Sequence, residues 1–339
     1  ACVKRSAENG ASSGTVSFRV SRVGCGQNCS VSIVPLAVGQ SSGSRFASQA
    51  SLAERQGASE PGPARERTGT NRKQRKARGR RRMRPIEGLL IDLDGTVYLG
   101  RELIPGSERT IDRVRAIGVP ILFTTNTSRM SRSDIALSLD SMGLRVDPSE
   151  IFSAPVAAAR WLRAEGVHRI HLLVADSTLE DFEGFEITDD RPDAVLVGDL
   201  GAGFTFERLN AAFRSLRRGA RLVAIHRNRF WLTEHGPTLD AGPFVAGLEY
   251  ASRQQATLVG KPSPAFFDAA ASRLGVRRDG LAVVGDDLET DVWGGRAAGL
   301  VTIQVRTGKF DQAMLDETPT EQRPHHIIDS LADVPSLLG

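Results

Sequence analysis

The sequence predicts an α/β protein: a three-layer α/β/α sandwich around a Rossmann-like parallel sheet, with a smaller α/β domain inserted into it. Three observations carry this prediction. Short apolar runs typical of buried parallel strands recur between residues 86 and 339, with helical periodicity between them. Polar residues directly follow four of these runs, and open parallel sheets bind ligands at this carboxyl edge. One interval between the runs is far longer than a helical crossover needs.

The first apolar run, Leu89 to Leu93, ends in two aspartates two residues apart, Asp92 and Asp94, followed by Gly95. Because strand side chains alternate between faces, the two carboxylates cannot both lie in the core, and the glycine turn lets both reach one crevice. Burying unpaired carboxylates is unfavourable, so we expect a cation beside them. Taken alone, the motif also fits an ordinary acidic turn.

The next two motifs suit the binding of phosphate oxygens. The run of residues 119–123 leads into Thr125 and Asn126, which offer a hydroxyl and backbone N–H groups. The run of residues 256–259 leads into Lys261, which delivers a point charge to an anion. Each motif by itself is more often turn chemistry than catalysis.

The fourth motif is an acidic cluster after residues 281–284, formed by Asp286, Asp287 and Asp291. Carboxylate oxygens are the ligands that Mg²⁺ prefers. Four such motifs in this order, all at strand ends, indicate a magnesium-assisted phosphoryl-transfer site.

The spacing of the motifs locates an inserted domain. Only 31 positions separate Asp94 from Thr125, enough for a short flap, one helix and the second strand. By contrast, 136 positions separate Thr125 from Lys261, whereas a βαβ crossover needs only about 30. We therefore expect three regions: a disordered basic extension at 1–84, a catalytic core at 85–150 and 254–339, and an inserted cap domain at 151–253.

Apolar periodicity, and glycines that end helices, assign the helices and strands within these regions. Residues 206–217 read as a helix because four apolar residues share one side. Gly143 and Gly275 end the helices of residues 135–142 and 265–274. The other expected elements are a flap at 98–105, helices at 107–117, 155–164, 243–250 and 291–298, strands at 169–175, 194–197, 221–226 and 301–305, and a final strand and helix after residue 327.

Charge and cysteine are unevenly distributed along the chain. Residues 1–82 hold 16 Lys or Arg against four Glu, a net charge of +12 that leaves −8 for residues 83–339. All three cysteines lie at or before Cys29, so the rest of the chain has no disulfide and no thiol nucleophile, which suits a reducing cytoplasm. No run is apolar for long enough to span a bilayer.

Residues 1–84 lack the periodicity of a folded domain. Two interpretations of them stay open. They form a real tail, whose basic block at 72–82 would serve as a nucleic-acid arm, a membrane-surface tether or a transit peptide, or the native protein starts at Met83.

From about Ile86 onward, the chain resembles the haloacid dehalogenase-like hydrolases, and within them subfamily IIA, which carries the larger type 2 cap. Residues 223–231 and 259–264 are similar to the group of haloacid dehalogenase-like hydrolase domain-containing protein 2 and phospholysine phosphohistidine inorganic pyrophosphate phosphatase. The family resemblance rests on the motifs Asp92 to Thr96, Thr125, Lys261, Gly285 to Asp287 and Asp291.

The resemblance implies roles for these residues in a magnesium-dependent phosphatase. Asp92 would be the nucleophile that forms an aspartyl-phosphate, and Asp94 would protonate the leaving oxygen and then deprotonate the attacking water. Asp92, the backbone carbonyl of Asp94 and Asp286 would hold Mg²⁺.

The same resemblance places Thr125, the N–H of Asn126 and Lys261 on the phosphoryl oxygens. Asp287 or Asp291 would orient metal-bound water or Lys261 from a second layer.

Substrate choice is expected to depend on loops of the cap, because the core motifs recognise only phosphate and metal. His226, Asn228 and Asp240 are the candidates, and each has an equally good structural interpretation. Small phosphate monoesters, phosphoamides and pyrophosphate all stay open as substrates. The resemblance also suggests a homodimer formed through the cap, and no membrane partner is expected.

Three other functions compete with a phosphatase. A phosphotransferase or phosphomutase would use the same aspartyl-phosphate with a substrate hydroxyl in place of water. Nucleic-acid binding has support only in the basic extension and is opposed by the charge of −8 on residues 83–339. A non-catalytic regulator is opposed by the complete set of acidic motifs.

Overall fold

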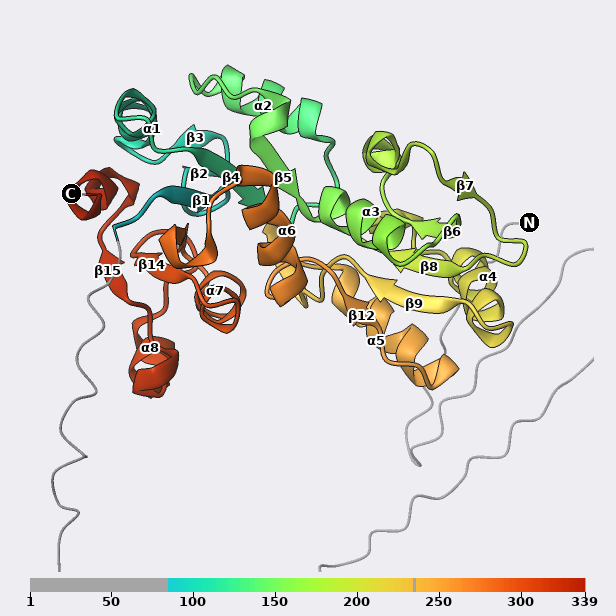
Figure 1. Cartoon of the computed structure of the whole chain (residues 1–339). Coiled ribbons are helices and arrows are strands. Elements are labelled where there is room, and N and C mark those ends of the chain that lie inside the picture. Colours follow the sequence, from blue (N-terminus) through green and yellow to red (C-terminus); the bar gives the residue numbers. More distant parts are fainter. Residues whose placement is uncertain (1–84, 234–235, 339) are drawn as a thin grey trace, which may run out of the picture. The chain divides into compact units, whose positions relative to one another are not determined.

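The computed structural model describes residues 85–233 and 236–338, and all of them lie in one compact unit (Figure 1). The expected basic extension, residues 1–84, falls outside the described residues. Two parallel sheets with helices packed against them form most of the described chain, beside two short antiparallel hairpins, which confirms the predicted α/β class.

The first sheet has six parallel strands in the order β15-β14-β13-β1-β4-β5. Strand β1 lies near its middle, between β13 and β4, so the ends of these three strands adjoin at one edge. The strands are β1 (Gly88–Asp92), β4 (Ile121–Thr125), β5 (Ile151–Ser153), β13 (Leu281–Gly285), β14 (Val301–Val305) and β15 (His326–Ile328).

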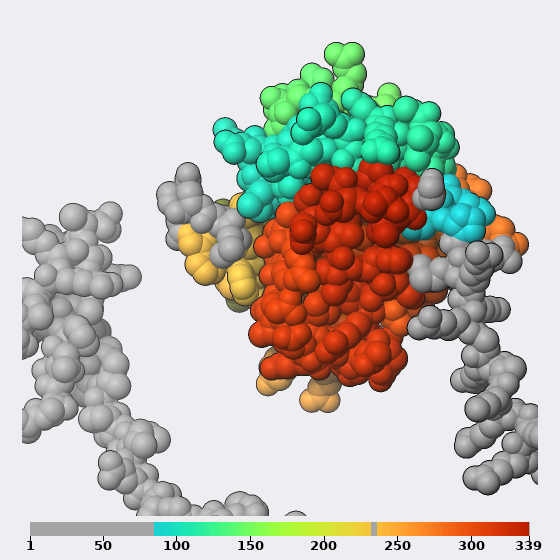
Figure 2. Space-filling model, turned by 90° about the vertical axis from the view of Figure 1, so that its left-hand side faces the viewer, coloured from blue at the N-terminus to red at the C-terminus, as the bar shows by residue number. Residues whose placement is uncertain are grey.

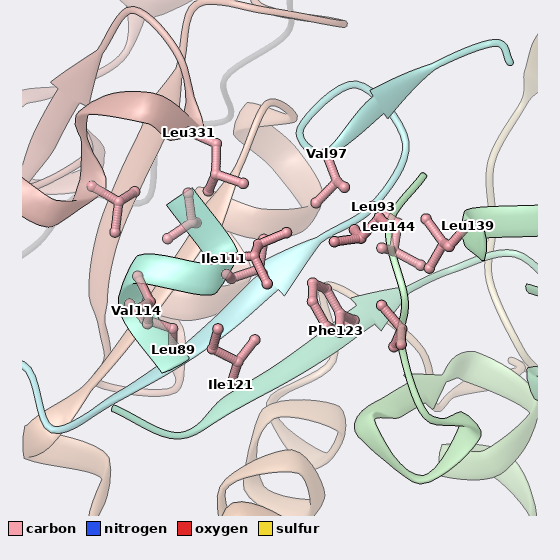
Figure 3. Packing of buried hydrophobic residues seen from close by; sticks show 14 of the residues in the cluster. Leu89, Leu93, Val97, Ile111, Val114, Ile121, Phe123, Leu139, Leu144 and Leu331 are labelled. Carbon is pink, nitrogen blue, oxygen red and sulfur yellow. The ribbon is translucent and has the colours of Figure 1, made fainter. Parts of the chain in front are cut away.

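Helices cover both faces of this sheet because the side chains of β1 alternate between two apolar clusters. Leu89 and Ile91 point into one cluster, which packs against α1 (Ser107–Ala116), α2 (Arg132–Ser141) and the 3₁₀ segment η7 (Leu331–Leu337). Figure 3 shows this cluster, with Ile111 of α1 and Phe123 of β4 among its labelled side chains.

Leu90 points to the opposite face, where Phe266 and Phe267 of α6 (Pro264–Leu274) pack with Ala298, which directly follows α7 (Gly294–Ala297). The core is therefore a three-layer sandwich. On another side of the molecule, Figure 2 shows the C-terminal segments beside the first segments of the core, consistent with the contact between η7 and α1.

The second sheet has five parallel strands in the order β12-β9-β8-β6-β7 and lies within the predicted insert apart from β12. Helices α4 (Phe206–Arg217) and α5 (Ala241–Ser252) pack on one of its faces. The strands are β6 (Arg169–Leu173), β7 (Glu186–Ile187), β8 (Ala194–Val197), β9 (Arg221–Ala224) and β12 (Thr257–Leu258).

Helix α3 (Ala154–Ala164) is shared between the two sheets. Its Ala157 belongs to the apolar cluster of the first sheet, whereas Ala158 and Leu162 belong to a cluster of the second. Small alanine side chains on two sides of one helix allow both sheets to pack closely against it.

Two short strands pair differently from what the expected boundaries of the insert imply. β5, at residues 151–153 of the expected insert, pairs with β4 in the first sheet. β12, expected as a strand of the core before Lys261, pairs instead with β9 in the second sheet. Both runs are too short for their apolar pattern to indicate which sheet they join, and only the backbone pairing decides it.

Other expected elements are present with shifted ends or a different geometry. The helix expected at 291–298 is a π-helical segment, η5 (Leu288–Trp293), followed by α7. The antiparallel hairpin of β10 (Phe230–Thr233) and β11 (Gly236–Leu239) was not predicted. The flap forms the small hairpin of β2 (Tyr98–Leu99) and β3 (Glu102–Leu103), and α8 spans Gln312–Glu317. Among the described helices, none combines the length and apolar character needed to cross a membrane.

The stability of the core should depend on the aromatic cluster beneath β1. Phe266 is fully buried, with its ring centroid 5.1 Å from that of Phe152 and 5.5 Å from that of Phe267. We expect Phe266→Ala to lower the free energy of unfolding by about 3–5 kcal/mol, because it leaves a cavity. Phe206→Ala is the control, because Phe206 is 76% exposed and its loss should change stability by less than about 0.5 kcal/mol. Similar denaturation midpoints for the two variants would contradict this account.

Candidate active site

The candidate site lies at the carboxyl edge of the first sheet, where β1 ends at Asp92. Asp286 follows the neighbouring strand β13, and Thr125 ends the neighbouring strand β4. Asp92 is buried and stands opposite Thr124 in the strand register. Parallel pairing therefore gathers motifs that are up to about 200 positions apart in the chain.

Lys261 joins two of these acidic residues. Its ammonium group donates to Asp92 Oδ1 at 2.5 Å and to Asp291 Oδ1 at 2.7 Å, and its side chain is only 2% exposed. Burial by itself would lower the pKa of Lys261, but the attraction of Asp291 and Asp92 outweighs it and raises that pKa. The lysine therefore stays charged inside the protein.

The carboxylates outnumber this ammonium group. One oxygen from each of Asp92, Asp286 and Asp291 lies within 4.8 Å of the others, and all three residues are buried. Burial, and then the negative charges of Asp92 and Asp291, raise the pKa of Asp286 to about 8. A site made of oxygen donors with excess negative charge fits a hard divalent cation such as Mg²⁺.

Two glycines make room for the Asp286 carboxylate. Gly95 and Gly308 have φ angles of 84° and 57°, and a Cβ atom on either would collide with that carboxylate. The two segments are joined by the Thr307 hydroxyl, which donates to the carbonyl of Gly95 at 2.5 Å.

The loop that carries Gly308 was missed by the sequence analysis. It follows β14, and its Lys309 N–H donates to Asp286 Oδ2 at 2.6 Å. The signal was available, because residues 301–305 are another apolar run that ends in polar residues and a glycine.

The two aspartates of the first motif have different environments. Asp92 is buried and bound by Lys261. Asp94 lies on the exposed side of the turn, and its backbone forms an isolated β-bridge with Tyr98. Loss of solvent around its carboxyl group, and then the charge of Asp92, raise the pKa of Asp94. A raised pKa on Asp94 suits a carboxyl group that acts as an acid.

The segment after β4 fixes the backbone that carries Lys261. Asn126 accepts the Lys261 N–H and donates to the Lys261 carbonyl, each at 2.9 Å. Thr125 is buried, and its hydroxyl accepts the N–H of Thr127 at 3.1 Å. The structure therefore shows Asn126 positioning the lysine through its side chain, and phosphate binding by Thr125 and the Asn126 N–H stays a prediction.

The two residues expected in a second layer do different things. Asp291 binds Lys261 directly, because the π-helical segment η5 turns it toward the sheet. Asp287 instead caps that segment by accepting the N–H groups of Glu289 and Thr290, and it also pairs with Lys309 Nζ at 3.4 Å. Of Asp287 and Asp291, only Asp291 contacts Lys261.

Of the three residues expected to choose the substrate, two lie inside the protein. His226 is 2% exposed, with Nε2 2.9 Å from the Ser128 hydroxyl, and burial lowers its pKa. Asp240 is also buried and caps α5 through the N–H of Ala241. The third, Asn228, accepts the N–H of Gly242 through its backbone carbonyl. Their role in substrate choice stays a prediction.

Comparison with known families matches two segments of the chain. Residues 89–188 match the family model described as haloacid dehalogenase-like hydrolase, and residues 258–334 match one described as HAD-hydrolase-like. These two segments contain the acidic residues, Thr125, Asn126 and Lys261, but not the three residues expected to choose the substrate.

Two curated relatives match most of the chain and nearly all of their own length. Haloacid dehalogenase-like hydrolase domain-containing protein 2 of Bos taurus is 37% identical over 257 residues, which cover 73% of this chain and 98% of the relative. Phospholysine phosphohistidine inorganic pyrophosphate phosphatase of Bos taurus is 34% identical and covers 76% and 96%.

Solved structures share the fold. A 4-nitrophenylphosphatase from Thermotoga maritima aligns with a TM-score of 0.70 at 31% identity, covering 75% of this chain and 98% of that one. A glycerol phosphate phosphatase from Mycobacterium tuberculosis, solved in complex with magnesium, aligns with a TM-score of 0.68 at 30% identity, covering 74% and 77%.

The acidic cluster predicts a pH-dependent response to magnesium. In the metal-free protein the pKa of Asp286 is raised from 3.8 to about 8, so the folded state retains a proton that the unfolded state loses. The metal-free protein should therefore lose stability as the pH rises through this window. Magnesium binds the ionised carboxylates, so its stabilising effect should grow over the same range.

Thermal unfolding in EDTA and in excess magnesium, at about pH 5.5 and about pH 8, measures this response. We expect the rise in Tm on adding magnesium to be larger at the higher pH and to be lost in Asp286→Asn. A rise that is equal at both pH values, or that persists in Asp286→Asn, would exclude this cluster as the metal site.

Proposed function

Because the chain belongs to the haloacid dehalogenase-like hydrolases and is a phosphatase of that family, we propose that it hydrolyses small phosphorylated metabolites with Mg²⁺. The reaction would pass through an aspartyl-phosphate on Asp92. The observation that carries this proposal is the buried Lys261, which binds both Asp92 and Asp291 while Asp286 lies beside them.

The residues at the edge of the sheet fit a magnesium ion. Asp92, Asp286 and the backbone carbonyl of Asp94 would hold it, and Asp291 would fix Lys261 next to it. When bound, Mg²⁺ neutralises charge on the carboxylates and on the transferring phosphoryl group. The magnesium complex of the glycerol phosphate phosphatase supports this assignment.

In the first step a carboxylate oxygen of Asp92 attacks phosphorus, and the bond from phosphorus to the leaving oxygen breaks. Asp94 gives its proton to that leaving oxygen, and the raised pKa of Asp94 favours the protonated form that this role requires. Lys261 offsets negative charge on Asp92 and on the phosphoryl oxygens throughout.

In the second step Asp94, now ionised, removes a proton from water, which attacks phosphorus and releases inorganic phosphate from Asp92. Thr125 and the N–H of Asn126 would bind the phosphoryl oxygens during both steps. Both lie where β4 ends, beside Asp92 on the adjacent strand.

The second sheet with its helices would form a cap, spanning about residues 154–259 once β5 is assigned to the core and β12 to the cap. Ser128, in the segment after β4, contacts both His226 and the N–H of Asp199, which belong to this region. The cap would therefore contact the same loop that positions Lys261. The loops of the cap would choose the substrate.

The names of the relatives support small substrates, among them phosphate esters, phosphoamides and pyrophosphate. A cytoplasmic location is part of the same proposal and rests on the lack of cysteine beyond Cys29.

Asp92→Asn tests the proposal at its nucleophile. The amide cannot form the acyl-phosphate at a useful rate, so we expect phosphate release to fall by at least about 10³-fold for every substrate. Release of phosphate from a panel of phosphorylated metabolites, with and without magnesium, provides the measurement. Circular dichroism and Tm serve as controls for folding. Near wild-type turnover by a folded Asp92→Asn protein would rule out the mechanism.

A further inference from the structure

Residues 85–338 contain only two lysines, Lys261 and Lys309, and the fold brings both to the same acidic site. Lys261 is buried, and its ammonium group donates to Asp92 and Asp291. The side chain of Lys309 is 65% exposed. The proposed mechanism uses the first lysine and gives no role to the ammonium group of the second.

The backbone at Lys309 is fixed against the catalytic motifs. Its N–H donates to Asp286 Oδ2, and two residues earlier Thr307 donates to the carbonyl of Gly95. The side chain therefore starts from a defined position beside the proposed metal ligands, and replacing it leaves the backbone hydrogen bond in place.

The ammonium group stands at the rim of the site. It lies 3.4 Å from Asp287 Oδ2, and that carboxylate is itself held by the N–H groups of Glu289 and Thr290. An ammonium group has three donors, so contact with Asp287 leaves others for a ligand.

The loop of Lys309 lies on the side where a leaving group would lie. Thr307 and Gly308 both contact Gly95, which directly follows Asp94, the proposed acid for the leaving oxygen. Lys261, by contrast, lies between Asp92 and Asp291, on the side of the transferring phosphoryl group.

We propose that Lys309 is a specificity residue that favours substrates whose leaving group is itself a phosphate, such as inorganic pyrophosphate and related phosphoanhydrides. This inference rests on the proposed phosphatase function. A second phosphate beyond the scissile bond brings negative charge to the rim of the site, which already holds several carboxylates. The ammonium group of Lys309 would offset the charge of that phosphate. A monoester with an uncharged leaving group gains no such contact.

The test compares kcat/KM for pyrophosphate and for 4-nitrophenyl phosphate, both with magnesium, in the wild type and in Lys309→Met. We expect the ratio of pyrophosphate to 4-nitrophenyl phosphate to fall by about tenfold or more when the charge is removed. Lys309→Arg keeps the charge and should restore most of the ratio.

Arg306→Met is the matched control. Arg306 is a cation on the same loop, but it pairs with Asp329 at 3.6 Å and stacks on Phe310 at 5.1 Å, away from the site. Its removal should leave the ratio within about twofold of the wild type, since exposed pairs contribute little.

The outcomes separate the two proposals. A wild type that hydrolyses neither substrate would overturn the proposed function. A wild type that hydrolyses 4-nitrophenyl phosphate but not pyrophosphate would overturn the inference about Lys309 alone. An equal loss of both activities in Lys309→Met, or a ratio that falls as far in Arg306→Met, would also overturn that inference.

Discussion

The structure depends on a charge imbalance at the end of β1. The carboxylates of Asp92, Asp286 and Asp291 are buried together, and the one buried ammonium group beside them, that of Lys261, binds only Asp92 and Asp291. Such a cluster is unfavourable unless a bound cation supplies further positive charge. The stability of the fold is therefore coupled to cation binding. The backbone around the cluster is arranged accordingly: glycines admit the Asp286 carboxylate, and the N–H of Lys309 binds it.

The position of Lys261 ties the two sheets together. The lysine follows β12, which pairs with β9 in the second sheet, yet its ammonium group binds Asp92 at the end of a strand in the first. Asn126 fixes the backbone of Lys261 from the loop after β4, and Ser128 on the same loop contacts His226. A change in how the second sheet packs would therefore be passed to Lys261 through only a few residues, and the proposed cap could act on the candidate site in this way.

Much of the fold was predictable because its signals are local. The runs that end at Asp92, Thr125 and Asp286 are buried parallel strands, and each precedes a residue of the site. The failures were mostly at short elements: residues 257–258 pair in the second sheet instead of the core, and the strand at 151–153 and the β10–β11 hairpin were not predicted. Two or three residues carry no periodicity that could specify a partner.

From the sequence alone came the order of the motifs, which indicated a phosphoryl-transfer site, and the family resemblance that implied a phosphatase. Only the tertiary structure could separate residues that look alike in the chain. Asp287 and Asp291 are both acidic neighbours of Asp286, but the π-helical turn sends one to cap a helix and the other to Lys261. Lys309 joined the site for the same reason: side-chain direction depends on how distant segments pack, which residue order does not specify.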